Sequence, residues 1–129
     1  MYCLDSSAVI DWMKGDVRIK SLLNKFGSVP IFVSTITLCE LFKGAHLSND
    51  VEKNLIIVNK IFDYFDILEL DNSAAKIYGE RYAELKKIGK LTQDFDLLIA
   101  SICISHSKVL VTKNKKHFEN IKGLKIEEW

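Results

Sequence analysis

Four carboxylates, at three places in this chain, lie next to apolar segments. Asp5 directly follows the short apolar run at residues 2–4. Glu40 lies in the early turns of one predicted helix, and Asp94 and Asp96 lie at the start of another. Carboxylates crowded into apolar surroundings repel one another and lose hydration, unless a shared cation neutralises them. These acids therefore predict a metal site.

Oxygen ligands without histidine or cysteine favour Mg²⁺ or Mn²⁺, which also bind substrate phosphates. Such ions lower the pKa of a coordinated water and stabilise the attacking and leaving oxygens in phosphodiester hydrolysis. We predict Asp5, Asp96 and Glu40 as catalytic metal ligands, with Glu40 binding the ion directly or through water, or orienting the attacking water. The three histidines share no metal-ligand spacing, which argues against a zinc site.

Polar and basic residues follow the apolar run at residues 109–111. Thr112 and Asn114, together with Ser6 beside Asp5, are predicted to hydrogen-bond the ligands. Between Lys108 and Lys125 there are six lysines against one acid, although the net charge of the chain is only +1. This local cationic strip could contact a polyanionic substrate. The lysines predicted to do so are Lys113, Lys115 and Lys116.

Each of these residues also has a purely structural interpretation. Asp94 could be a helix cap as well as a ligand, and Asp5 could be a turn residue. Glu40 could pair with a lysine, and the lysine run could be a solvated surface. The functional interpretation depends on the four segments meeting at one place in the fold.

Short apolar strands alternate with helices along the chain. Strands are predicted at residues 2–5, 31–33, 67–70 and 109–111, with a short fifth at 125–126. Predicted helix caps are Ser6 or Ser7, Ser34 or Thr35, Asp71 or Ser73, and Thr92 or Asp94. This alternation predicts a parallel sheet covered on both faces, a three-layer α/β/α sandwich. The carboxyl ends of its strands would share one edge, where such folds place their sites.

The composition is that of one globular domain covering residues 1–129, with 48% hydrophobic and 27% charged residues. No apolar run reaches membrane-spanning length and no signal peptide is evident, so we expect a cytoplasmic protein. The three cysteines are predicted to be reduced core thiols.

Five segments carry a resemblance that spans essentially the whole chain. They are Leu4-Asp5-Ser6-Ser7, residues 34–44 with Glu40, Asp96-Leu97-Leu98-Ile99-Ala100, residues 110–114 with His117-Phe118, and the closing residues 123–129. In this order they resemble the PIN-domain ribonucleases, and within them the VapC-type toxins of type II toxin–antitoxin modules.

The resemblance implies a PIN-like sandwich with a short, mainly parallel central sheet and a Mg²⁺-dependent or Mn²⁺-dependent endoribonuclease. The implied substrate is structured RNA such as tRNA or ribosomal RNA. The implied partners are a second copy, in a homodimer, and a cognate VapB-type antitoxin that blocks the site with a peptide segment. Asn114 and His117 stand where many PIN domains place a fourth acid. This departure favours one firmly held ion, or a second recruited with substrate and helped by Asp94.

Two other functions are compatible with the sequence. One is a PIN nuclease that processes RNA outside a toxin–antitoxin pair. The other is a non-catalytic α/β module that binds a partner or a nucleotide, although no glycine-rich phosphate loop occurs in the chain.

Overall fold

Five parallel strands form the central sheet of the structure, a computed structural model that describes residues 1–129. They are β1 (Tyr2–Leu4), β2 (Ile31–Ser34), β3 (Asp66–Leu68), β4 (Val109–Val111) and β5 (Lys125–Glu127). Their order across the sheet is β3-β2-β1-β4-β5, and every neighbouring pair is parallel. The strands are short and apolar because helices bury both faces of a parallel sheet.

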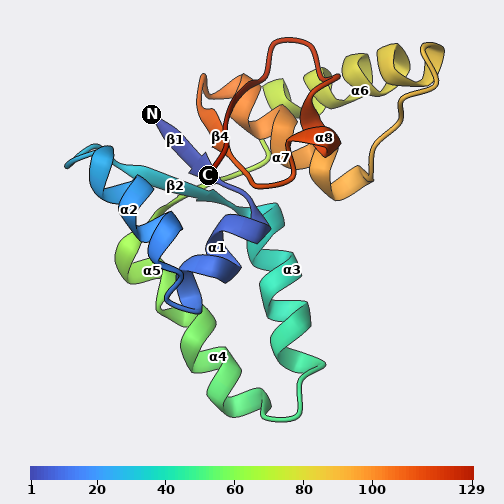
Figure 1. The fold of residues 1–129 in the computed structure, drawn as a ribbon. Coiled ribbons are helices and arrows are strands. Elements are labelled where there is room, and N and C mark those ends of the chain that lie inside the picture. Colours follow the sequence, from blue (N-terminus) through green and yellow to red (C-terminus); the bar gives the residue numbers. More distant parts are fainter.

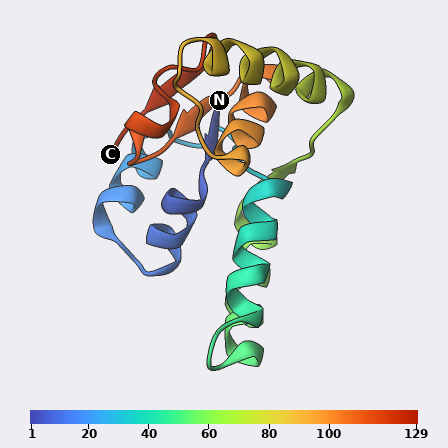
Figure 2. The ribbon, with the colours of Figure 1, turned by 90° about the vertical axis from the view of Figure 1, so that its right-hand side faces the viewer.

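Helices cover the two faces of this sheet (Figure 1). Between β1 and β3 the chain forms α1 (Ser6–Met13), α2 (Val17–Lys25), α3 (Thr35–His46), α4 (Val51–Asn59) and α5 (Ile61–Tyr64). After β3 it forms α6 (Asn72–Lys87), α7 (Asp94–Ser105) and α8 (Lys115–Phe118). Figure 2 shows α3 and α4 extending together away from the sheet. The predicted three-layer sandwich is confirmed.

Successive residues of a strand are buried in two separate hydrophobic cores, because their side chains point to alternate faces of the sheet. Cys3 and Leu110 are fully buried in the core beneath α6 and α7. Leu4 and Val111, one residue further along, are fully buried in the other core, with α1 to α5. All the helices are too short or too polar to span a lipid bilayer.

Polar side chains just before several of the helices cap them. Ser34 accepts a hydrogen bond from the Thr37 amide at 3.1 Å, and Asp71 accepts one from the Ala74 amide at 2.7 Å, as predicted. The cap of α1 is Asp5, so the prediction of Ser6 or Ser7 was wrong. The extended backbone of Asp5 lets its own carboxylate reach the helix amides first.

The prediction that Thr92 or Asp94 caps α7 was also wrong. Gln93 occupies the cap position and makes no side-chain cap bond, while Asp94 is the first helical residue. The ends of β1 and β3 lie one and two residues earlier than predicted. Cys3 and Cys103 are buried thiols as expected, but Cys39 is exposed, because it lies on the outer side of α3.

β1 is the point at which the order of the strands reverses. The chain runs from β1 to β2 on one side and later places β4 on the other. In open α/β sheets such a reversal opens a crevice at the carboxyl ends of the two strands, where ligands bind. Asp5 follows β1 and Thr112 follows β4, and the Asp5 amide donates to the Val111 carbonyl at 3.1 Å.

Candidate metal centre

Asp5 is the most enclosed acid at the strand reversal, with only 4% of the residue exposed. Its Oδ1 accepts hydrogen bonds from the Ala8 amide at 2.8 Å and from the Ser7 hydroxyl at 2.6 Å. Desolvation raises the pKa of Asp5, although hydrogen bonds from Ser7, Thr112 and the backbone oppose the shift. Burial thus works against the charge of this carboxylate, while its hydrogen bonds hold the group in one orientation.

Glu40 reaches the same region through Ser6. The Ser6 hydroxyl donates to Glu40 Oε1 at 2.5 Å, which joins the start of α1 to α3. The buried Thr37 lies one turn before Glu40, and its Oγ1 is within 3.5 Å of the hydroxyls of Ser6 and Ser34. This hydroxyl network fixes Glu40 relative to Asp5, because Ser6 directly follows that residue.

Asp96 lies in the first turn of α7, with a side chain that is 20% exposed. The ring nitrogen Nδ1 of His117 lies 3.2 Å from Asp96 Oδ2. Desolvation raises the pKa of Asp96, the neighbouring His117 opposes this shift, and the charge of Asp5 adds to it. Asp5 is therefore close enough to Asp96 for its negative charge to disfavour the charge on Asp96, as expected of two acids at one site.

The four predicted acids are not brought together equally. Asp5 and Asp96 interact electrostatically, and Glu40 is joined to them through Ser6. Asp94 is exposed and accepts a hydrogen bond from the Tyr78 hydroxyl at 2.7 Å, so its carboxylate is bound to α6. No three carboxylate, imidazole or thiol side chains close into a ready-made metal cage.

Two predicted partners of the ligands lie after β4. Thr112 is fully buried, interacts with the carboxylate of Asp5, and accepts a hydrogen bond from the Asn114 amide at 3.0 Å. Asn114 is exposed and takes part through its backbone, while its side chain makes no hydrogen bond. Thr112 thus contacts a predicted ligand directly, and Asn114 orients Thr112.

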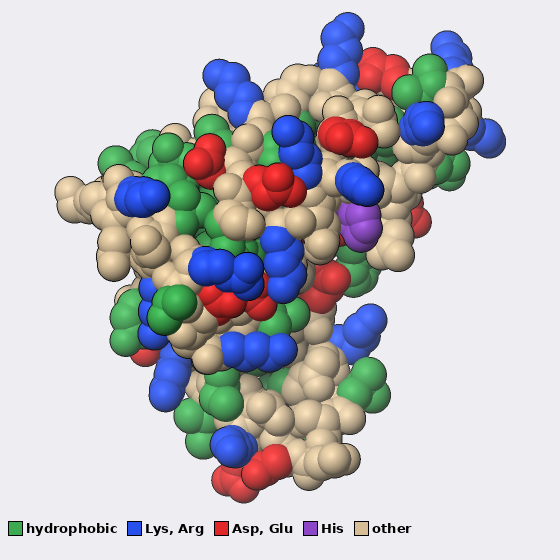
Figure 3. All heavy atoms as spheres, in the orientation of Figure 1, with side chains coloured by type: hydrophobic (Ala, Val, Ile, Leu, Met, Phe, Trp, Pro, Cys, Tyr) green, Lys and Arg blue, Asp and Glu red, His purple; other side chains and the backbone are tan.

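The three lysines predicted to contact substrate have different surroundings. Lys113 Nζ lies 2.9 Å from Oδ2 of Asp11, a buried acid on α1, so Lys113 already has a protein partner. Lys115 and Lys116 are exposed on α8 and form no ion pair. Figure 3 shows basic and acidic side chains interspersed over this face, with no single large basic patch.

Two contacts at the site were not foreseen from the sequence. The pairing of His117 with Asp96 joins residues 21 apart, and that of Lys113 with Asp11 joins residues 102 apart. No local pattern identifies either pair. The one available signal was that His117 stands at a position where the resemblance leads one to expect an acid.

The family model described as PIN domain matches residues 2–124 of the chain. Known proteins also resemble the chain over most or all of its length. The tRNA(fMet)-specific endonuclease VapC of Shigella flexneri is 36% identical over 97 residues, covering 75% of this chain and 74% of that protein. Ribonuclease VapC2 of Haemophilus influenzae is 33% identical over 130 residues, covering 99% and 97%. The crystal structure of VapBC2 from Rickettsia felis, bound to a promoter DNA fragment, has a TM-score of 0.93 at 29% identity, covering 99% and 98%.

Proposed function

Since this chain belongs to the PIN-domain family and, within it, to the VapC-type ribonucleases, we propose that it is a metal-dependent endoribonuclease and the toxin of a toxin–antitoxin pair. The observation that carries the proposal is the buried Asp5 at the strand reversal, with Glu40 held by the adjacent Ser6 and with Asp96 near enough for the charge of Asp5 to raise its pKa. Their position is the one at which open α/β sheets bind ligands.

The donor set fits a hard divalent cation. Burial raises the pKa of both Asp5 and Asp96, the charge of Asp5 adds to the shift at Asp96, and Glu40 is held nearby by Ser6. Oxygen donors of this kind suit Mg²⁺ or Mn²⁺. Asp5 and Asp96 would bind the ion, and Glu40 would bind it or orient the attacking water. Asp94 would join only by leaving Tyr78.

When bound, such an ion activates water and stabilises the charge that develops on the phosphodiester. The side chains of this protein contribute orientation. The bonds from Ala8 and Ser7 fix Asp5, and the bond from Ser6 fixes Glu40. His117 stands beside Asp96. Because water rather than the ribose 2′-hydroxyl is the nucleophile, the products would carry 5′-phosphate and 3′-hydroxyl ends.

The proposed substrate is structured RNA in the cytoplasm, and tRNA is the first one to test because one relative is named a tRNA(fMet)-specific endonuclease. The proposed inhibitor is a VapB-type antitoxin, since the similar Rickettsia felis structure is a VapBC complex. Homodimer formation is part of the same proposal.

The test is cleavage of purified tRNA and ribosomal RNA by the wild-type protein and by Asp5→Asn, with Mg²⁺, with Mn²⁺ and with EDTA. Asp63→Asn on α5 is a matched control, because Asp63 is an exposed acid that forms no ion pair. We expect wild type and Asp63→Asn to cleave only with metal, and Asp5→Asn to lose cleavage.

End mapping of the products provides a second test. Cleavage that persists in EDTA and in Asp5→Asn would refute the metal mechanism. Products with 2′,3′-cyclic phosphates would show that the ribose hydroxyl attacks, and would refute the assignment of water as the nucleophile.

A further inference from the structure

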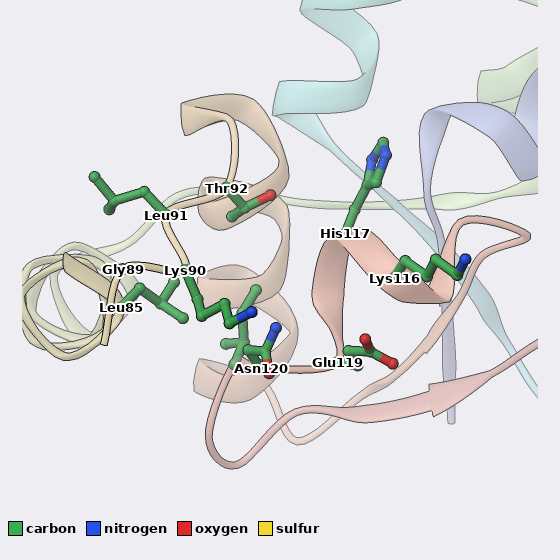
Figure 4. Close-up of a pocket in the computed structure, with 10 residues that line it drawn as sticks. Leu85, Gly89, Lys90, Leu91, Thr92, Lys116, His117, Glu119 and Asn120 are labelled. Carbon is green, nitrogen blue, oxygen red and sulfur yellow. The ribbon is translucent and has the colours of Figure 1, made fainter. Parts of the chain in front are cut away.

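A pocket of about 390 Å³ lies between the segment after α6 and helix α8. Its volume falls within the range of roughly 300–1,000 Å³ that is typical of ligand sites. Ten residues line it, and only three of them are hydrophobic. Figure 4 shows Lys90 extending toward Asn120, and it shows His117 on α8 with its ring directed away from both.

The backbone on the α6 side of the pocket is tightly held. Gly89 ends the helix with φ +67°, a left-handed conformation that glycine adopts without strain. The Lys90 amide then donates to the Leu85 carbonyl at 2.9 Å, which ends the helix in a closed turn. This turn sets the direction in which Lys90 enters the pocket.

The pocket is rich in donors that have no protein partner. Lys90 and Lys116 form no ion pair, and the amide of Asn120 and the hydroxyl of Thr92 form no side-chain hydrogen bond. Glu119 is the one acid that lines the pocket. Ammonium, amide and hydroxyl groups all donate to phosphate oxygens. The chemistry of the pocket therefore suits a singly anionic group.

His117 connects this pocket to the metal centre. It lines the pocket, and its ring nitrogen lies 3.2 Å from the carboxylate of Asp96. A nucleic acid cut at Asp96 must continue past that residue on both sides of the cleaved bond. The pocket is a concave surface with two lysines, and His117 belongs both to its lining and to the surroundings of Asp96.

We propose that this pocket holds an RNA phosphate next to the one that is cleaved, bound by Lys90 and Asn120. This assignment rests on the proposed nuclease function. The site would set which linkage reaches Asp96, and so would contribute to the choice of cleavage position.

The test measures RNA binding without cleavage. The affinity of a tRNA-derived hairpin is measured by fluorescence anisotropy at several salt concentrations, in EDTA, for wild type, Lys90→Gln and Lys90→Arg. Lys87→Gln is the matched control, because it removes the same charge from the end of α6 but Lys87 does not line the pocket. Thermal unfolding establishes that each variant is folded.

Losing one phosphate contact lowers the salt dependence of log K by roughly 0.7–0.9, so the loss of affinity in Lys90→Gln should grow about threefold from about 200 to 50 mM salt. We expect Lys90→Arg and Lys87→Gln to keep the wild-type salt dependence. Replacing single RNA phosphates by neutral methylphosphonates should identify one linkage whose neutralisation weakens wild type but not Lys90→Gln.

If the wild-type protein cleaves RNA but Lys90→Gln keeps the wild-type salt dependence of binding, the pocket assignment is wrong and the proposed nuclease function still stands. Loss of antitoxin binding with unchanged RNA binding would assign the pocket to the antitoxin and overturn it as well. If the wild-type protein with Mg²⁺ cleaves no RNA, the proposed function itself fails.

Discussion

Asp5 has two roles that different substitutions separate. Its carboxylate caps α1, and it is a buried acid at the candidate metal centre. Asparagine keeps an oxygen that can accept from the Ala8 amide and removes the charge, whereas alanine removes both. Because Asn and Asp are equally good caps, we expect metal-free Asp5→Asn to be at least as stable as wild type at neutral pH. Asp5→Ala should be less stable than Asp5→Asn.

The magnitude follows from the bonds that alanine removes. Loss of a cap costs about 1 kcal/mol, and a buried amide left without an acceptor raises the cost to about 2 kcal/mol. The bonds lost are those from the Ala8 amide and the Ser7 hydroxyl. For a domain of this size, about 4 °C per kcal/mol places the melting temperature of Asp5→Ala about 8 °C below that of Asp5→Asn.

The pH dependence has a definite sign, because burial raises the pKa of Asp5 above its ordinary value of 3.8. Between 3.8 and the higher folded pKa, the unfolded chain loses this proton before the folded protein does. Wild type should therefore lose stability relative to Asp5→Asn as the pH rises through that window. Above the folded pKa the difference should be constant.

The assay is thermal unfolding followed by circular dichroism in EDTA at several pH values, and then with Mg²⁺. We expect Mg²⁺ to raise the melting temperature of wild type more than that of Asp5→Asn, because a ligand stabilises the state that binds it. An Asp5→Asn protein less stable than wild type in EDTA at neutral pH would refute the desolvation argument. Equal stability of Asp5→Asn and Asp5→Ala would refute the capping argument.

Three further predictions concern other polar contacts in the protein. Lys113→Gln leaves the buried Asp11 unpaired and should lower the free energy of unfolding by about 2 kcal/mol in urea titrations, while Asp11→Asn combined with Lys113→Gln should recover much of the loss. Ser6→Ala removes the hydrogen bond that orients Glu40, and it should lower kcat about tenfold with little change in KM or melting temperature. An unchanged kcat would show that Glu40 takes no part in the mechanism. Hydrogen bonds from the Ala74 amide and the Ser105 hydroxyl, with the nearby His106, lower the pKa of Asp71 below 3.8. The stability that this carboxylate supplies is therefore present above that pH, and it is lost as the pH falls below it. The melting temperatures of wild type and Asp71→Asn should therefore converge on acidification, and a gap that widens would contradict this sign.

Much of the architecture follows from local patterns in the sequence. Short apolar runs between helical segments predict a parallel sheet, because only strands buried on both faces are so uniformly apolar. Ser34 and Asp71 were predicted as caps and act as such, since a cap bonds to an amide only a few residues away. Strand ends bearing Asp5 and Thr112 could likewise be placed at one edge, because parallel strands share their direction.

The sequence alone left each acid with two interpretations, and only the tertiary structure separated them. Asp5 proved to be both a cap and the enclosed acid at the strand reversal, whereas Asp94 bonds to Tyr78 on a neighbouring helix. The pairings of His117 with Asp96 and of Lys113 with Asp11 join distant segments. Propensity and periodicity describe a few neighbouring residues, so the sequence determined the elements and the acids at their ends. Which side chains face one another depends on how the helices pack on the sheet, and only the fold decides that.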